Sequence, residues 1–317
     1  MDPGPRQRPS RRFIGMAGLL GALRNLGLLG RGAGDDPLLQ PFVADDGLRI
    51  PVRVLGEGTP VVLVHGLGCS HRHWLPVARR LRRRCRVYAW DARGHGACRP
   101  EPGSVITLSR LANDLQQLIA HFGLVRPVLV GHSMGALAVM QYLRDHGTAG
   151  VCGVALVDQS PRIVTDEGWR LGLFGGCSRE MILGLVAGAR ENLAEAVLHE
   201  VEAATGPWLR RQMAADAPFG RLLRRWLGGL DTGGLLDLAE SLALADFRAL
   251  LPTLDLPTWV VLGGNSPHYS GVPLDRYYRR VVPHASVDVY ERSGHSPHVA
   301  EPGRFANDLL RFIDDHS

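Results

Sequence analysis

Lysine is missing from this sequence: all 36 basic residues are arginine, and with 31 acidic residues they leave a formal net charge of +5. Codon bias in a GC-rich bacterial genome is the simplest explanation. The densest basic run lies between positions 79 and 86. We interpret it as the solvated C-terminal end of a helix, with a patch for an anionic surface as the alternative. No nucleic-acid-binding motif accompanies it, so we expect no nucleic-acid partner.

Cysteine is scarce as well. The five cysteines are an odd number, and no two of them stand in C-x-x-C spacing, which argues against a disulfide framework and against a zinc site. Hydrophobic residues make up 45% of the chain and charged residues 21%, as in an ordinary soluble globular protein. We therefore expect a core that needs neither disulfides nor a metal, and a site with no metal and no organic cofactor.

The sequence also lacks an uninterrupted apolar run of about 20 residues, the length that a transmembrane helix requires. In the N-terminal extension, residues 1–40, Arg24 and Asn25 interrupt the apolar region. Residues 10–14 loosely resemble a twin-arginine export signal, but no Ala-x-Ala cleavage site follows. Leucines at helical spacing instead predict an amphipathic helix. We expect a cytoplasmic protein, with export or membrane contact through residues 13–30 as the alternative.

Beyond Pro41, apolar runs that predict strands alternate with periodic segments that predict helices. Strands are predicted over residues 48–55, 61–64, 86–90, 127–130, 154–157, 259–262 and 287–290. Helices are predicted over residues 71–84, 108–122, 135–143 and 305–312. The first two strands, joined by Gly56-Glu57-Gly58, are expected to form a hairpin. The alternation predicts a parallel sheet with helices on both faces.

The strand pattern disappears between residues 161 and 255, where only helical pieces are predicted. We interpret this stretch as a helical cap inserted into a single catalytic core formed by residues 41–160 and 256–317. Its aromatic and methionine side chains suggest a pocket for an apolar acyl or aryl group, although they would equally serve as the cap's own core. These side chains are Trp169, Phe174, Met181, Trp208, Phe219 and Trp226.

The strongest chemical motif is Gly131-His132-Ser133-Met134-Gly135, a G-x-S-x-G sequence between a predicted strand and a predicted helix. Such a turn holds its serine in a strained conformation, and small residues at both ends allow the strand and helix to approach. The serine hydroxyl then lies at a helix N-terminus, where the dipole favours developing negative charge. We predict that Ser133 is a nucleophile.

A second motif, His65-Gly66-Leu67-Gly68, follows the strand predicted over residues 61–64. A glycine-rich loop at this point can present backbone N–H groups to an oxyanion. The expected oxyanion-hole donors are the N–H groups of Leu67 and of Met134, the residue after the nucleophile. His65 is expected to order this loop rather than to act in catalysis.

The third motif is Ser293-Gly294-His295-Ser296-Pro297-His298, in the loop between the last predicted strand and the last predicted helix. A general base needs this freedom to reach a serine across the carboxyl edge of the sheet. His295 directly follows a glycine within the loop, whereas His298 approaches the helix. We therefore predict His295 as the base and keep His298 as the competing candidate.

These motifs together resemble those of the α/β-hydrolase superfamily, in the branch of bacterial esterases, cofactor-free haloperoxidases, lactonases, carbon–carbon bond hydrolases and dehalogenases. The similarity extends over about residues 45–315 and includes Asp91-Ala92-Arg93-Gly94-His95-Gly96 and Glu301-Pro302. It implies the α/β-hydrolase fold, with a mostly parallel central sheet and a helical cap inserted before the penultimate strand. It also implies that the Asp91–Gly96 segment is a structural turn without a catalytic role.

The resemblance implies an aspartate three residues after the glycine that ends the penultimate strand, but Ser266 stands there. A hydroxyl cannot stabilise an imidazolium as a carboxylate does. Asp158, at the end of the strand after the nucleophile's, occupies the place from which some dehalogenases take their acid. Our hypothesis is that Asp158 is the triad acid, against a role in capping the following turn. Asp275, Asp166 and a dyad without an acid are the other possibilities.

A serine at the elbow forms an acyl-enzyme, whereas dehalogenases and epoxide hydrolases of this fold use aspartate. We therefore expect hydrolysis of a small carboxylic ester, thioester or lactone. Acyl transfer from the same acyl-enzyme is one alternative, and its mark would be product ester formed in the presence of alcohols. A non-catalytic ligand-binding protein is the other, favoured only by Ser266, and failure of a serine-directed probe to label the protein would support it. Oligomeric state is left open.

Overall fold

The computed structural model describes residues 39–192, 217, 221, 232–269, 273–282 and 284–316. Almost all of the predicted N-terminal extension, including the predicted amphipathic helix and its possible membrane contact, lies outside the described residues. In the described parts of the chain, no helix has the length and apolar character needed to cross a membrane.

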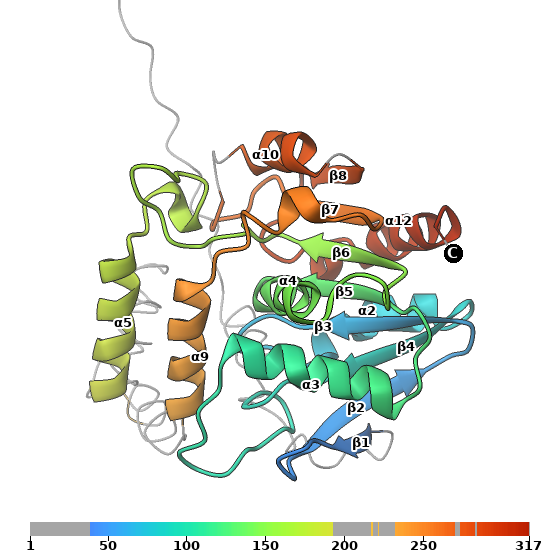
Figure 1. The fold of residues 1–317 in the computed structure, drawn as a ribbon, viewed down its shortest axis with the longest axis horizontal. Coiled ribbons are helices and arrows are strands. Elements are labelled where there is room, and N and C mark those ends of the chain that lie inside the picture. The colour runs from blue at the N-terminus through green and yellow to red at the C-terminus, as the bar shows by residue number, and fades with distance from the viewer. Residues whose placement is uncertain are drawn as a thin grey trace, which may run out of the picture.

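The described residues form an eight-stranded sheet in the order β1-β2-β4-β3-β5-β6-β7-β8 (Figure 1). The strands are β1 Leu39–Val43, β2 Arg49–Leu55, β3 Thr59–Val64, β4 Cys85–Trp90, β5 Val128–His132, β6 Gly153–Val157, β7 Thr258–Gly263 and β8 Ala285–Tyr290. β1 and β2 run antiparallel to their neighbours, and every pair from β4 to β8 is parallel. The predicted, mostly parallel α/β fold is therefore confirmed, and each predicted strand is present.

The predicted hairpin of residues 48–55 and 61–64 is wrong. β4 lies between β2 and β3, and the hairpin partner of β2 is β1, for which no strand was predicted. Gly56 and Gly58 carry the chain closely over the start of β4: a Cβ on Gly56 would lie 2.3 Å from the carbonyl oxygen of Arg82, and one on Gly58 would lie 2.2 Å from that of Arg84. A glycine turn between two strands looks the same locally whether the strands pair or pass over a neighbour.

Helices cover both faces of the sheet. On one face lie α3 (Leu108–His121), α4 (Met134–His146) and α10 (Leu274–Val281), and on the other lie α2 (Leu75–Leu81) and α12 (Pro302–Asp314). The helix predicted over residues 71–84 is shorter than expected, because a 3-10 turn, His71–Trp74, precedes α2 and the helix ends at Leu81. A short helix, α11 (Pro297–Ala300), precedes α12.

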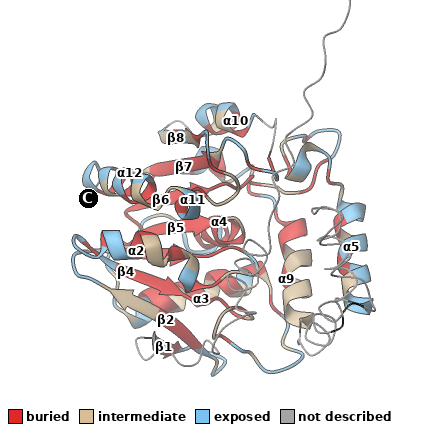
Figure 2. Cartoon of the chain, turned by 180° about the vertical axis from the view of Figure 1, so that it is seen from behind, coloured by how far each residue is buried: buried red, intermediate tan, exposed pale blue. Residues whose placement is uncertain are grey.

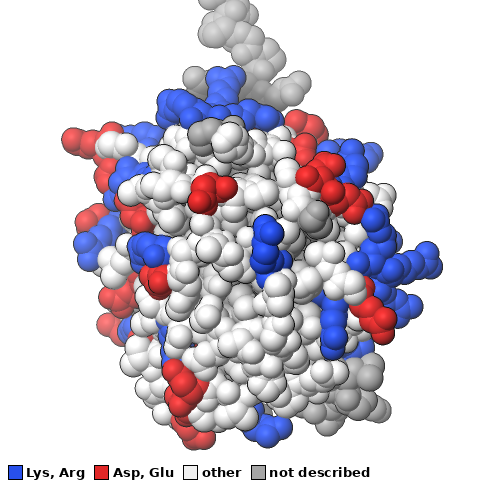
Figure 3. Space-filling view, turned by 45° about the vertical axis from the view of Figure 1, so that its right-hand side comes forward, with Lys and Arg blue, Asp and Glu red and all other residues white. Residues whose placement is uncertain are grey.

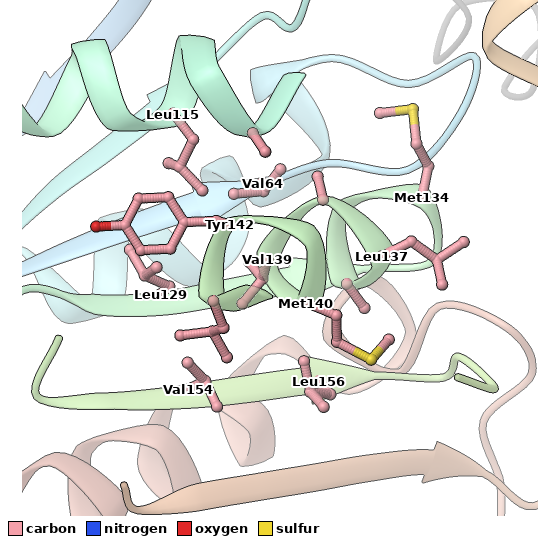
Figure 4. Packing of buried hydrophobic residues seen from close by; sticks show 14 of the residues in the cluster. Val64, Leu115, Leu129, Met134, Leu137, Val139, Met140, Tyr142, Val154 and Leu156 are labelled. Atoms are coloured by element: carbon pink, nitrogen blue, oxygen red, sulfur yellow. The ribbon is translucent and has the colours of Figure 1, made fainter. Parts of the chain in front are cut away.

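The core explains why the central strands are apolar along their whole length. Every residue of β5 and β6 is buried, because helices pack on both sides of these strands (Figure 2). Leu137 and Met140 of α4 contribute to the core cluster together with Leu129 and Leu156 of the sheet (Figure 4). Each such side chain contributes about 1.5–3 kcal/mol to the free energy of folding on full burial. The packing of α4 on the sheet therefore stabilises the positions of the residues that follow β5 and β6.

Between β6 and β7, the described residues form two helices beside the sheet, α5 (Arg179–Glu191) and α9 (Gly233–Leu244) (Figure 1). They share a small apolar cluster that includes Ile182, Val186 and Ala243. Two 3-10 turns, η3 (Leu173–Gly175) and η4 (Leu251–Thr253), flank them. The helices lie in the region predicted as a cap, and the division of the chain into core and cap stays a prediction.

Candidate active site

Ser133 lies on a sharp turn between β5 and α4. Its φ of 53° and ψ of −120° are strained for a residue with a side chain. A Cβ on Gly131 would lie 2.3 Å from the carbonyl oxygen of Gly135, and a Cβ on Gly135 would lie 2.2 Å from that of Val64. Larger residues at these two positions would force the strand and helix apart. The local geometry is thus that of the predicted nucleophile elbow.

Asp158 follows β6 and is fully buried. Its Oδ2 accepts a hydrogen bond from Nδ1 of His295 over 2.7 Å and another from the hydroxyl of Ser266 over 2.6 Å. Oδ1 accepts from the N–H of Gly263 over 2.8 Å. Gly263 at the end of β7 and the loops after β7 and β8 thereby supply the donors that fix the carboxylate, and the backbone of Asp158 has a positive φ of 47°. The structure brings together Asp158, Ser266 and His295, which are distant in sequence.

His295 is held at its backbone as well as at its ring. Nε2 of His132, the residue before Ser133, lies 2.8 Å from the carbonyl oxygen of His295, and the two rings are 4.7 Å apart between centroids. His295, the predicted general base, therefore lies beside the turn that carries Ser133, and its Nδ1 faces Asp158. The competing candidate, His298, is fully buried and stacks on Trp74 at 4.0 Å.

The other carboxylates considered as acids lie elsewhere. Asp166 forms an ion pair with Arg162 at 2.5 Å, and Asp275 is in the first turn of α10. The hydrogen bond of His295 goes to Asp158 instead.

The loop after β3 lies against the elbow, because a Cβ on Gly66 would be 3.3 Å from the Cβ of Ser133. The N–H of Ala92 donates to Nε2 of His65, so Nδ1 carries the ring hydrogen and donates to the carbonyl oxygen of Gly66 over 2.8 Å. Burial lowers the pKa of His65 to about 3, so the ring stays neutral. These contacts support the predicted loop-ordering role of His65.

The two predicted oxyanion donors come from the two segments that meet at Ser133, namely α4 and the loop after β3. Met134 is the first residue of α4, so its N–H has no acceptor within the helix. Leu67 follows Gly66 in the adjacent loop. The Met134 N–H therefore lies at the start of α4 beside Ser133, and Leu67 lies on the loop whose Gly66 approaches Ser133.

Asp91 forms a second, separate aspartate–histidine pair. Its Oδ1 accepts from the backbone N–H of His71 over 2.7 Å and lies 2.8 Å from that residue's Nδ1, while Oδ2 accepts from the N–H of Ala97 over 2.8 Å. Burial opposes the charged form, but the hydrogen bonds from His71 and Ala97 outweigh it and lower the pKa of Asp91. A Cβ on Gly96 would lie 2.3 Å from this carboxylate, so only glycine fits. The contacts are those of a structural turn.

An aromatic side chain of the predicted cap reaches the site through a residue for which no role was predicted, His268. The ring of His268 lies 4.0 Å from that of His295 on one side and stacks on Phe174 at 5.6 Å on the other. Burial, with the adjacent His295, lowers the pKa of His268 to about 4. Nothing in the sequence motif indicated this contact, because His268 and Phe174 belong to different loops.

The side chains proposed to line a pocket differ in their burial. Trp169 is buried against Tyr277, and its indole N–H donates to the carbonyl oxygen of Arg162 over 2.9 Å, so it belongs to the core. Phe174 and Met181 are exposed. Trp208, Phe219 and Trp226 lie outside the described residues.

The basic side chains do not form a single patch on the face shown in Figure 3. Basic and acidic side chains there lie mostly around a broad region of uncharged side chains. The predicted basic run at residues 79–86 is exposed, except for Leu81 and Cys85, and Arg84 pairs with Asp314 at 2.8 Å. Among the described residues, no group of three or more histidine, cysteine or acidic side chains is arranged to hold a metal ion.

This protein belongs to the α/β hydrolase family, whose model matches residues 61–308. It is similar to a non-heme haloperoxidase of Rhodococcus erythropolis, with 27% identity over 285 residues, covering 86% of this chain and 99% of that protein. It is also similar to a pimeloyl-[acyl-carrier protein] methyl ester esterase of Chromobacterium violaceum, with 29% identity over 275 residues, covering 84% and 99% respectively. Among solved structures, the esterase RhEst1 from Rhodococcus sp. ECU1013 has a TM-score of 0.65 at 25% identity, covering 88% of this chain and 100% of that one. The predicted superfamily and the prediction of an enzyme are confirmed.

Proposed function

We propose that the protein is a serine hydrolase that cleaves a carboxylic ester, thioester or lactone through an acyl-enzyme on Ser133. The observation that carries the proposal is the hydrogen bond of 2.7 Å between His295 and Asp158, beside a strained serine at a helix N-terminus. A nucleophile, a base and a carboxylate that orients the base are the parts that acyl transfer requires.

In the acylation step, Ser133 attacks the carbonyl carbon of the substrate and gives its proton to Nε2 of His295. That nitrogen is the available one, because Nδ1 is engaged with Asp158. The imidazolium then protonates the leaving alkoxide or thiolate as the tetrahedral intermediate collapses. Asp158 holds the ring in the required tautomer and stabilises its positive charge.

The backbone N–H groups of Leu67 and Met134 would stabilise the oxyanion of each tetrahedral intermediate. Loss of one such donor costs on the order of 10² to 10³ in rate. In deacylation, His295 removes a proton from the water that attacks the acyl carbon, and the imidazolium returns this proton to the oxygen of Ser133 as the acid leaves.

A substrate with an apolar acyl or aryl group fits the surroundings of His295. The exposed ring of Phe174 and the imidazole of His268 extend from it as an aromatic surface. Two of the similar proteins are named as esterases, which supports ester cleavage over the other acyl compounds. The feature that favoured a non-catalytic protein, Ser266, contacts Asp158 directly and so fits an intact site.

The test is the initial rate of hydrolysis of p-nitrophenyl acetate, butyrate and octanoate by the purified protein and by Ser133→Ala. We expect kcat/KM to fall by several orders of magnitude in the variant, because alanine lacks the oxygen that accepts the acyl group. The chain length with the highest kcat/KM would define the size of the acyl site.

Ser293→Ala is a matched control, since the hydroxyl of Ser293 donates to Glu301 over 2.6 Å and not to the residues proposed for catalysis. A fluorophosphonate probe should label the wild type and fail to label Ser133→Ala. Equal rates and no labelling in both proteins would contradict the proposed function.

A further inference from the structure

His132 is placed where three loops meet. It ends β5 immediately before Ser133, and its ring lies between those of His295 and His298, with centroids 4.7 and 4.6 Å away. Its Nδ1 faces the oxyanion loop, since a Cβ on Gly66 would lie 2.9 Å from that nitrogen. One buried side chain therefore touches the elbow, the loop after β3 and the loop after β8.

The hydrogen bond of His132 fixes its protonation. Its Nε2 lies 2.8 Å from the carbonyl oxygen of His295, and a carbonyl can only accept. Nε2 thus carries the ring hydrogen. Burial, reinforced by the neighbouring His298 and His295, holds the pKa of His132 well below its ordinary value. In this arrangement the ring acts as a hydrogen-bond donor through Nε2.

The hydrogen bond between His132 and His295 anchors a segment without helix or strand. Between Tyr290, which ends β8, and Pro297, which begins α11, the chain forms neither helix nor strand, and His295 lies within it. Asp158 holds the ring of His295 and His132 holds its carbonyl oxygen. Because His132 is covalently next to Ser133, this second anchor ties the backbone of the base to the backbone of the nucleophile.

We propose that His132 is a positioning residue that sets the distance between Ser133 and His295 through its hydrogen bond to the backbone of His295. This inference rests on the proposed function. A displacement of about 1 Å in a catalytic group can cost about 10²-fold in rate, so a single anchor of this kind has a large effect on kcat.

Two amide substitutions separate the hydrogen bond from the rest of the side chain. In His132→Gln, the side-chain amide nitrogen reaches the place of Nε2 and keeps the donor. In His132→Asn, the amide is one carbon shorter, reaches only the place of Nδ1 and loses the bond. We expect kcat to stay within a few-fold of wild type in His132→Gln and to fall about 10²-fold in His132→Asn, with KM nearly unchanged in both.

His298→Leu is the control for the ring cluster. His298 contacts the same ring, but within the described part of the chain its two nitrogens have no hydrogen-bond partner. It should change kcat less than His132→Asn does. Equal losses in the Gln and Asn variants, or an equal loss in His298→Leu, would overturn the proposal.

A readout without turnover keeps this test separate from that of the proposed function. The proton between Nδ1 of His295 and Asp158 should give a downfield NMR resonance that is absent in Asp158→Asn. It should remain sharp in His132→Gln and broaden in His132→Asn, because the loop then loses its hydrogen bond to His132. An unchanged resonance in His132→Asn would overturn positioning by His132, whereas a wild type that neither hydrolyses esters nor labels with fluorophosphonate would overturn the proposed function alone.

Discussion

Among the described residues, two buried aspartates each pair with a histidine through hydrogen bonds of almost equal length. Nδ1 of His71 lies 2.8 Å from Asp91, and Nδ1 of His295 lies 2.7 Å from Asp158. Each carboxylate also accepts backbone N–H groups, from His71 and Ala97 in the first pair and from Gly263 in the second. By local chemistry alone, either pair resembles part of a catalytic triad.

The two pairs differ in the access that their histidines have. The side chain of His71 is 0% exposed, whereas that of His295 is 22% exposed. His71 begins a helical turn over the sheet, and its carboxylate partner is closed off by Gly96. His295 lies on a loop beside Ser133. An aspartate–histidine bond therefore marks a catalytic site only where the second ring nitrogen can meet a nucleophile and a substrate.

The largest expected effect is that of Asp158→Asn. The amide cannot stabilise an imidazolium and favours the wrong tautomer of His295, so kcat/KM for p-nitrophenyl butyrate should fall about 10⁴-fold. The thermal unfolding midpoint, measured beside it, should change far less. Turnover within a few-fold of wild type would refute the assignment of Asp158 as the acid.

The matched change in the other pair is Asp91→Ala, which should act on stability. Removing one partner of a buried pair leaves the donors around it unsatisfied, and the free energy of unfolding in urea should fall by about 3–5 kcal/mol. The protein that remains folded should keep kcat within a few-fold of wild type. A large fall in kcat without loss of stability would show that the two pairs do not differ as described.

The smallest of these effects is expected for Ser266→Ala. The hydroxyl of Ser266 donates to the same oxygen of Asp158 as His295 does, and its loss should leave the carboxylate less firmly oriented. A hydrogen bond to a charged group contributes about 1.5–3 kcal/mol, so we expect kcat to fall about 10- to 100-fold. Ser293→Ala, measured in parallel, should have little effect. Equal rates in the two variants would show that the hydroxyl of Ser266 does not contribute to catalysis.

Much of the fold was predictable because its strands are short apolar runs with helices between them. β5 and β6, buried along their whole length, have the sequence that a central parallel strand requires. The exceptions were at the antiparallel edge, where β1 has no comparable apolar run and β2 was paired with the wrong strand. Partner choice there depends on how the Gly56–Gly58 turn crosses β4, which local periodicity does not record.

The residues of the candidate site differ in how far the sequence alone could identify them. Ser133 was predictable because Gly131 and Gly135 stand on either side of it, and the tight turn requires small residues there for local steric reasons. His295 and His298 were separable only by their distance from a helix, and the structure distinguishes them by burial and by the bond to Asp158. Ser266 was interpreted as a missing acid, because the sequence could not reveal that its hydroxyl lies against Asp158.

By itself, the sequence determined most of the strands, where the elbow bends, and that small residues are needed at positions 131 and 135. Only the tertiary structure decided which carboxylate meets His295, what Ser266 contacts and which backbone His132 anchors. The hydrogen bonds that settle these points join residues that are separated in the sequence by 137, 108 and 163 positions. Strand and helix periodicities carry information over a few residues, so contacts across such separations are set by how the strands order themselves in the sheet.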